Sequence, residues 1–354
     1  MLLHSYSTIA IVQTAFLGDV ALSMFFVEEV RMAHPSARII VVTTPKSAPL
    51  VRCCASVDEV IEFDKRGADS GIKGILRVAR RMRDLGVDLV FGLQRSARTA
   101  IVARLCGARA CVGFAQATAS FLYTTRVTWE LSKHETQRNH ELLSVFTDIA
   151  DVVIPDKLRC IPEVISEVNE LRGSQQIGNV LMSTRAGGAE VKRVVLAPGS
   201  VWFTKRWPED HWVTLATKLV QSGNEVTIMG GSDDFSLCVR LADRSGATCP
   251  ARPLSLQESL RVLANSDVLV TNDSAPTHMA AMVGTRTITI YGSTVPAFGF
   301  APRGPRDVVV ENTSLTCRPC GLHGKRSCPL GTMECMTSIL PQKVMDLVNS
   351  TTLK

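Results

Sequence analysis

The chain has 354 residues, more than one hydrophobic core usually supports, and this length predicts two domains. Its hydrophobic fraction of 45% and charged fraction of 20% are ordinary for a globular protein and exclude the disordered, collagen-like and coiled-coil classes. The net charge is +6, and eleven cysteines, most of them scattered through apolar runs, favour reduced thiols over a secreted disulfide scaffold.

The apolar segment at residues 9–30 is the first place to look for a membrane span or an export signal. Asp19, Glu28 and Glu29 interrupt it, so it does not predict a spanning helix. It also lacks the basic start and the small-residue cleavage site of a secretory signal. We therefore expect a cytoplasmic protein, and peripheral contact with a membrane surface stays open.

Apolar β-branched runs alternate with helical patterns along the whole chain. In the first half, strands are predicted at residues 9–14, 38–43, 60–64, 89–94 and 110–114, with helices at 20–34, 72–85 and 97–105. In the second half, strands are predicted at 193–198, 225–230, 268–272 and 287–291, with helices at 209–222, 235–245, 256–264 and 276–283. Strand–helix alternation of this kind predicts an α/β fold of two Rossmann-like, doubly wound domains.

The stretch at residues 154–192 is rich in proline and glycine and carries mixed charge, which indicates a linker. We expect an N-terminal domain over 1–153 and a C-terminal domain over 193–338. A last helix within 339–354 is expected, and packing of this helix back on the N-terminal domain is considered. Neither half has the glycine fingerprint of a dinucleotide site, and the P-loop sequence is absent, which argues against dehydrogenase and ATPase functions.

A first motif, Phe16-Leu17-Gly18-Asp19, joins a predicted strand to a helix. Gly18 permits a tight turn with positive φ, and Asp19 then lies at the start of the helix, at the carboxyl edge of the sheet. Two interpretations stay open: Asp19 is an N-cap, or it is a general base that faces a cleft between the domains.

Two further motifs follow strands of the second half. Ser200, Thr204 and Lys205 lie in a loop whose hydroxyls and positive charge suit a diphosphate, although a solvated loop would look the same. Asp273 and Ser274 follow the strand at 268–272, where Ser274 is a natural N-cap and the helix amides face a ligand. A histidine in a first helical turn, as His278 is, is more often structural than catalytic.

Taken together, these motifs resemble the family 9 glycosyltransferases, the heptosyltransferases of lipopolysaccharide core assembly, and most of all their heptosyltransferase II branch. The matching stretches are residues 16–20, 93–100, 107–114, 197–200, 204–208, 271–280 and 290–296. The resemblance implies a GT-B fold with an interdomain cleft between an acceptor-binding N-terminal domain and a nucleotide-sugar-binding C-terminal domain. It also implies inverting transfer of L-glycero-D-manno-heptose from ADP-heptose to a sugar hydroxyl of the inner core, without a required metal or cofactor.

By motif match, Asp19 would be the general base, and Lys205 would stabilise the leaving diphosphate. The donor pocket would be lined by Ser200, Thr204, Asp273, Ser274 and His278, and the acceptor would be held by Gly18, Arg95 and Arg98. The family usually has glycine where this chain has Ala275, and a methyl group there narrows the approach of a phosphate.

The stretch from Lys73 to Arg109 is strongly basic: nine lysines and arginines against two aspartates leave a local charge of +7. The resemblance supplies an anionic partner, an acceptor linked to lipid A, and Arg95 and Arg98 suit its carboxylates and phosphates because arginine forms bidentate pairs. The helix at 72–85 either lies on the anionic cytoplasmic face of the inner membrane or is a solvated face.

Two other functions are weighed. One is a family 9 transferase with another acceptor, such as a different core position or a protein serine. The other is a non-enzymatic relative that binds polyanions; nucleic acid is not expected as a partner, because Phe91 is the one aromatic residue of the basic stretch.

A cluster of four cysteines near the C-terminus, Cys317, Cys320, Cys328 and Cys335, opens with a Cys-x-x-Cys pair. Such thiols suit a structural zinc or iron ion, and reduced thiols or a conditional disulfide are the alternative. No catalytic role is expected for them.

Overall fold

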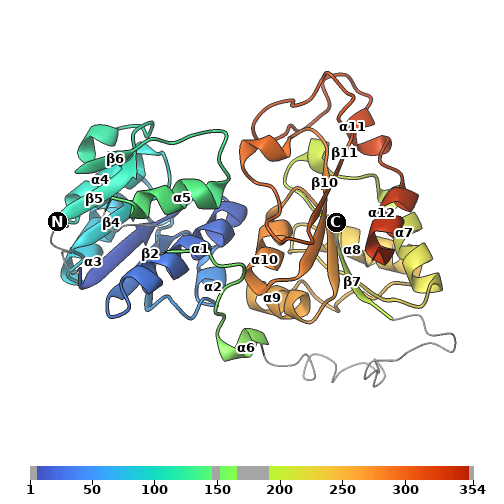
Figure 1. The fold of residues 1–354 in the computed structure, drawn as a ribbon, viewed down its shortest axis with the longest axis horizontal. Coiled ribbons are helices and arrows are strands. Elements are labelled where there is room, and N and C mark those ends of the chain that lie inside the picture. Colours follow the sequence, from blue (N-terminus) through green and yellow to red (C-terminus); the bar gives the residue numbers. More distant parts are fainter. Residues whose placement is uncertain (1–5, 146–151, 166–190, 351–354) are drawn as a thin grey trace. The chain divides into compact units, whose positions relative to one another are not determined.

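The structure is a computed structural model, and it describes residues 6–145, 152–165 and 191–350. Contacts divide the chain into two compact units, Met1–Ile161 and Pro162–Lys354, each built around a parallel sheet (Figure 1). In the part of the chain that the structure describes, no helix combines the length and apolarity needed to cross a membrane.

The first unit contains a six-stranded sheet in the order β3-β2-β1-β4-β5-β6. Its strands are β1 (Thr8–Val12), β2 (Arg38–Thr43), β3 (Glu59–Glu62), β4 (Leu89–Gly92), β5 (Ala110–Phe114) and β6 (Thr125–Val127). Its helices are α1 (Leu17–Ala33), α2 (Ala48–Val51), α3 (Gly71–Asp84), α4 (Ala97–Leu105), the 3-10 turn η1 (Ser120–Leu122) and α5 (Glu135–Leu143).

The second unit contains a five-stranded sheet in the order β11-β10-β9-β7-β8. Its strands are β7 (Arg193–Ala197), β8 (Glu225–Ile228), β9 (Val268–Asn272), β10 (Arg286–Tyr291) and β11 (Val308–Glu311). Its α-helices are α6 (Pro162–Ile165), α7 (Glu209–Gln221), α8 (Phe235–Ser245), α9 (Leu256–Ala264), α10 (Ala275–Val283), α11 (Glu334–Thr337) and α12 (Pro341–Asn349), with 3-10 turns η4 (Phe203–Lys205) and η5 (Pro296–Phe298).

All strand pairs of both sheets are parallel, so helices must connect them and cover both faces. In the first unit, α1 packs with α5 and α3 packs with α4, in separate layers (Figure 1). The residues of β1 are all buried, as expected of a strand between two helical layers. The alternation of strands and helices read from the sequence is therefore the observed architecture.

Each sheet has one point at which the strand order reverses. β1 pairs with β2 on one side and with β4 on the other. β7 likewise pairs with β8 on one side and with β9 on the other. In doubly wound sheets, ligands bind outside the carboxyl ends of the strands at such a switch point. The loops that follow β1, β4, β7 and β9 are therefore the places to look for function.

The C-terminal helix α12 lies against α7 in the second unit. Its buried side chains, Val344, Met345 and Val348, join the core around Trp212 and Ile290. The apolar face of α12 is thus buried within the second unit, and the packing of this helix on the N-terminal domain stays a prediction. Residues 166–190 of the expected linker at 154–192 lie outside the described residues.

Candidate active site

The first switch point carries Asp19, which lies in the first turn of α1 and is half-buried. The N-cap of α1 is Phe16, so Asp19 occupies the third position of the helix and is not the N-cap that one interpretation proposed. Gly18 is likewise inside the helix and is absent from the residues with positive φ, contrary to the expected tight turn. A carboxylate in this position is favoured by the positive end of the helix dipole.

Lys65 is a neighbour of Asp19 that the sequence analysis did not single out. Its ammonium group donates a hydrogen bond to the backbone oxygen of Thr14 and lies 3.3 Å from the Thr14 hydroxyl. Burial lowers the pKa of Lys65, the charges of Arg98 and Arg66 lower it further, and the charge of Asp19 opposes them. The signal for Lys65 was its place directly after the predicted third strand.

The loop after β4 brings Gln94 and Arg95 to the same switch point, and Arg98 follows in the first turn of α4. The Thr14 hydroxyl donates a 2.7 Å hydrogen bond to Gln94 Oε1 and so joins the loops that follow β1 and β4. Ser96 caps α4 and accepts a hydrogen bond from the Thr99 amide. Among the described residues, the guanidinium groups of Arg95 and Arg98 have neither a hydrogen bond nor an ion pair, so both cations are available to an anion.

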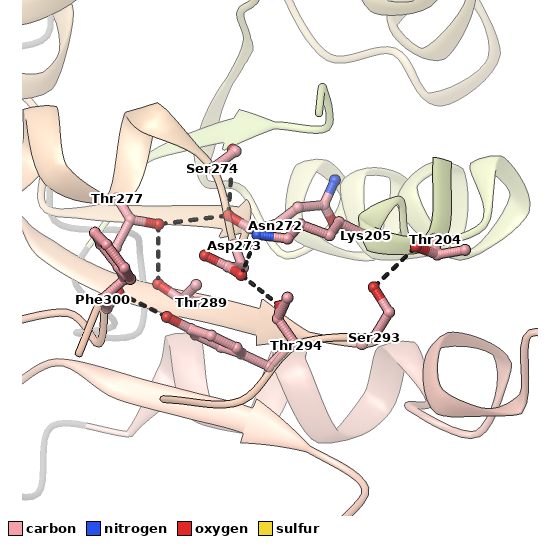
Figure 2. Close-up of polar contacts among 12 residues, drawn as sticks. Thr204, Lys205, Asn272, Asp273, Ser274, Thr277, Thr289, Ser293, Thr294 and Phe300 are labelled. Atoms are coloured by element: carbon pink, nitrogen blue, oxygen red, sulfur yellow. Dashed lines mark hydrogen bonds and ion pairs between the residues drawn. The ribbon is translucent and has the colours of Figure 1, made fainter. Parts of the chain in front are cut away.

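In the second unit, the centre of the candidate site is an ion pair between Lys205 and Asp273 (Figure 2). Lys205 Nζ lies 2.6 Å from Asp273 Oδ2, and the side chains are 13% and 9% exposed. The Thr294 hydroxyl donates a second hydrogen bond of 2.6 Å to the same oxygen. Three residues from η4 and from the ends of β9 and β10 thus meet at the second switch point.

Thr204 is held by the segment around Lys325 rather than left open to a ligand. Its hydroxyl lies 2.9 Å from the Ser293 hydroxyl (Figure 2). It also accepts a 2.8 Å hydrogen bond from the Lys325 amide. Ser200 is buried, and its backbone oxygen accepts a hydrogen bond from Arg206 Nε. Thr204 and Ser200 therefore shape the loop that presents Lys205.

The turn between β9 and α10 is built around Asn272. Its side-chain amide donates to the Pro198 oxygen at 2.7 Å, which ties the end of β9 to the end of β7. Ser274 is the N-cap of α10 by position, but its side chain makes no capping bond and instead donates to the Asn272 oxygen. Ala275 is the first residue of α10 and has ordinary helical geometry, so the methyl group is accommodated without strain.

His278 is buried on α10, and its ring lies 6.4 Å from that of Phe300. Burial raises the pKa of the neighbouring Tyr291 phenol well above its usual range, and the charge of Asp273 adds to this effect. The Tyr291 hydroxyl donates to the Phe300 oxygen at 2.7 Å. The role of His278 in the donor pocket stays a prediction, whereas Ser293 and Thr294 are site residues that the sequence analysis passed over, although they lie just after the predicted strand at 287–291.

The four cysteines near the C-terminus line one pocket of about 310 Å³. Cys335 is buried, Cys317 is exposed, and the Cys320 thiol donates to the Cys317 backbone oxygen. Across residues 6–145, 152–165 and 191–350, no group of three or more histidine, cysteine, aspartate or glutamate side chains is arranged to hold a metal ion. The thiols share a pocket but do not fit the structural metal site considered from the sequence.

A family model for glycosyltransferase family 9 (heptosyltransferase) matches residues 75–330, well over half of the chain. The chain belongs to this family. It is therefore a glycosyltransferase, as the motifs at the two switch points indicated.

Individual relatives agree with this assignment. Lipopolysaccharide heptosyltransferase 1 of Pseudomonas aeruginosa is 24% identical over 364 residues, which cover 95% of each chain. The family 9 glycosyltransferase of Veillonella parvula has a similar structure, with a TM-score of 0.82, 20% identity and 98% of each chain covered. ADP-heptose LPS heptosyltransferase II of E. coli gives a TM-score of 0.74 at 18% identity over 97% of each chain. The predicted fold class, two Rossmann-like α/β domains of the GT-B type, is confirmed.

Proposed function

We propose that this glycosyltransferase moves L-glycero-D-manno-heptose from ADP-heptose to a sugar hydroxyl of the lipopolysaccharide inner core, with inversion. The observation that carries the proposal is the Lys205–Asp273–Thr294 cluster at the second switch point, in a chain of this family. Two of the relatives named above are lipopolysaccharide heptosyltransferases by name, and the name of one includes ADP-heptose.

On the donor side, Lys205 is proposed to stabilise the diphosphate as it leaves the anomeric carbon. Asp273 holds the ammonium group at 2.6 Å, and Thr294 holds Asp273, so the cation is oriented before the donor binds. Preorganised charge of this kind acts where negative charge develops and costs no reorganisation during the reaction. Ser274 and the first amides of α10 are proposed to bind the same diphosphate.

On the acceptor side, Asp19 is proposed to take the proton of the attacking hydroxyl as the new C–O bond forms. A carboxylate is far less basic than an alkoxide, so it assists only in the transition state, which typically contributes ~10²–10⁴-fold. Lys65 interacts electrostatically with both Asp19 and Arg98, so positive charge is present beside the proposed base and attracts an anionic acceptor. Arg95 and Arg98 are proposed to bind the acceptor's carboxylates or phosphates.

The outer side of α3 is proposed to rest on the anionic membrane surface that holds a lipid-linked acceptor. Ile72 is 75% exposed and Leu76 is 46% exposed. Lys73 and Arg80 lie on the same helix, are exposed, and have no ion pair among the described residues. Aliphatic side chains beside unpaired cations are typical of interfacial helices. Flotation with anionic and zwitterionic vesicles tests this: Leu76→Ser should weaken anionic binding, and equal binding to both vesicles would contradict it.

The activity itself is tested by a mass assay with ADP-heptose and lipid A precursors that carry zero, one or two heptoses. Transfer to one precursor supports the proposal and assigns the core position. Transfer to a protein serine, or to none of these acceptors, points to another family 9 acceptor. Salt-sensitive binding of polyanions without turnover would favour the non-enzymatic alternative.

A further inference from the structure

We propose that Trp129 is a positioning residue for the acceptor: its indole ring holds the guanidinium of Arg95 flat, so that its N–H donors face a carboxylate or phosphate. This inference rests on the proposed function, because it assigns the acceptor's anionic group to Arg95. It adds a residue, and a reason for specificity, that neither the sequence motifs nor the family match supplies.

The first observation is the stacking of Arg95 on Trp129. The guanidinium carbon of Arg95 lies 3.8 Å from the centre of the indole ring. At that distance the ring contacts one face of the guanidinium, while the N–H bonds, which lie in the guanidinium plane, stay free. Among the described residues, that guanidinium makes no hydrogen bond and no ion pair. A stacked arginine with unused donors presents a fork to a planar or tetrahedral oxyanion.

The second observation is that Trp129 is itself held firmly. Its amide donates a 2.8 Å hydrogen bond to Gln116 Oε1. The guanidinium carbon of Arg138 lies 4.3 Å from the centre of the same ring, and Arg138 is fully buried. Arg138 donates to the Leu131 oxygen at 2.6 Å and pairs with Glu135 at 2.8 Å. The buried arginine therefore fixes the ring, and the ring fixes the exposed arginine.

The charge of this cluster is unbalanced in favour of an anion. Arg95 and Arg138 bring two positive charges, and among the described residues Glu135, which is buried, brings one carboxylate that pairs with Arg138 and interacts electrostatically with Arg95. Arg98, three residues after Arg95, adds another cation without a partner among the described residues. Arg95 also directly follows Gln94, whose side chain marks the first switch point through its hydrogen bond to Thr14. The unused charge thus lies where a doubly wound sheet binds its ligands.

The plain alternative is that the Arg95–Trp129 contact only stabilises the fold. The structure offers a matched control for this. The guanidinium carbon of Arg109 lies 5.1 Å from the ring centre of Tyr6. Tyr6 comes just before β1 and Arg109 just before β5, so this contact lies at the amino ends of the strands, whereas the switch point lies at their carboxyl ends. Tyr6→Leu removes this cation–π contact, together with the edge contact of Tyr6 with His34, away from the switch point, so it shows how the loss of such contacts affects stability rather than acceptor binding.

The test compares acceptor kinetics of Trp129→Leu, Trp129→Phe, Arg95→Ala and the Trp129→Leu/Arg95→Ala double variant in the full chain. Trp129→Leu should raise the acceptor KM roughly three- to thirtyfold, the range of a cation–π contact, and leave the donor KM unchanged. Trp129→Phe should keep most of the wild-type affinity, and Tyr6→Leu should change no kinetic constant. In the Arg95→Ala background, Trp129→Leu should have no further effect, because the ring acts through Arg95.

Two acceptor analogues separate the sources of the anion, one with its phosphates removed and one with its carboxylates esterified. The analogue that lacks the group bound by Arg95 should bind wild type and Trp129→Leu equally. Additive effects in the double variant, or an unchanged acceptor KM, would overturn the inference.

A measurement without turnover separates this inference from the proposed function. The Nε–Hε signal of Arg95 in ¹⁵N NMR should show the ring-current shift of an indole and should move on titration with inorganic phosphate. Trp129→Leu should abolish the ring-current shift and weaken the response to phosphate. If wild type transfers no heptose but these signals behave as stated, the anion site stands and the proposed reaction falls. If neither signal changes in Trp129→Leu, the positioning role falls.

Discussion

Lys205 and Asp273 form an ion pair of 2.6 Å in which both side chains are largely buried. They come from loops that follow β7 and β9, which are neighbours in the second sheet. A cation kept in place by a buried carboxylate is oriented for a diphosphate, but it is also neutralised until the diphosphate arrives. The pair therefore serves both the proposed reaction and the stability of the domain, and different substitutions separate the two.

Lys205→Ala should lower kcat/KM for ADP-heptose by about 10²–10³, the usual loss when one preorganised donor is removed from developing negative charge. Steady-state kinetics with the donor varied measure this. Lys218→Ala is the matched control, because Lys218 is a lysine of the same unit that bonds to Gln342 on the surface. Unaltered donor kinetics in Lys205→Ala would remove Lys205 from the diphosphate site.

Asp273→Asn should lower the free energy of unfolding by about 3 kcal/mol, because it leaves the buried ammonium of Lys205 without its counter-charge. Adding Lys205→Met to this variant should restore much of the stability, since removal of both partners of a buried pair is often nearly neutral. Urea denaturation of the two variants measures both effects. A double variant less stable than Asp273→Asn would mean that Lys205 is stabilised by something other than Asp273.

Asp19→Asn should lower kcat by roughly 10²–10⁴ and leave the affinity for ADP-heptose within a few-fold, because the amide keeps the shape but cannot take a proton. Single-turnover assays and donor titration give the two quantities separately. Asp84→Asn, an exposed aspartate at the end of α3, should change neither. Wild-type turnover in Asp19→Asn would show that another group is the base.

The difference between prediction and structure is clearest at Asp19. The helical pattern placed the start of the first helix at residue 20, whereas α1 begins at Leu17, so an expected turn and N-cap became the first helical turn. Asn272 and Asp273 were located correctly, because a parallel strand must be followed by a loop at the carboxyl edge. α5 was missed because most of its buried residues are polar, and its apolar buried residues, Leu142 and Leu143, are too few to show a helical period.

Contacts between residues far apart in the sequence could not be predicted either, because some of the segments that make them show no sequence pattern. The stacking of Arg95 on Trp129 joins the loop after β4 to the segment between β6 and α5. β6 was not predicted, because a three-residue edge strand, Thr125–Val127, is too short to show a pattern. By contrast, the pairing of Lys205 with Asp273 follows once both loops are known to lie at adjacent strands.

A pH-dependent contribution to stability should come from His140 and Glu29, whose side chains lie 2.5 Å apart between α5 and α1. The hydrogen bond to Glu29 raises the pKa of His140 above its usual value, against the effect of burial. Because the folded state binds the proton more tightly, the stabilisation is complete below about pH 6.5, the unfolded pKa, and is lost as pH rises through the raised pKa of His140.

Urea denaturation at several pH values between 5.5 and 8.5 isolates this pair when wild type is compared with His140→Gln. The difference in unfolding free energy should be largest at the acid end and shrink as pH rises. Burial lowers the pKa of His34 and of His211, so their contributions to stability change with pH in the opposite sense. Both histidines are present in wild type and in His140→Gln, so the difference in unfolding free energy between these two proteins removes their contributions. His323→Gln, at an exposed position, is the control. A constant difference across the range would contradict the role of the pair.

The four cysteines near the C-terminus should differ in reactivity although they line one pocket. The pKa of Cys328 is lowered by hydrogen bonds from backbone amides, of which that of Met333 has the largest effect. The pKa of Cys320 is instead raised by burial. Because the thiolate is the nucleophile, iodoacetamide at pH 7.5 should alkylate Cys328 several-fold faster than Cys320. Cys238, in the core of the same unit, has its pKa raised by burial to about 12 and should stay unlabelled until the protein unfolds. Peptide mass spectrometry over a time course measures the order in which the cysteines are alkylated. Labelling of Cys320 ahead of Cys328 would show that access to the pocket, rather than stabilisation of the thiolate, decides which cysteine reacts.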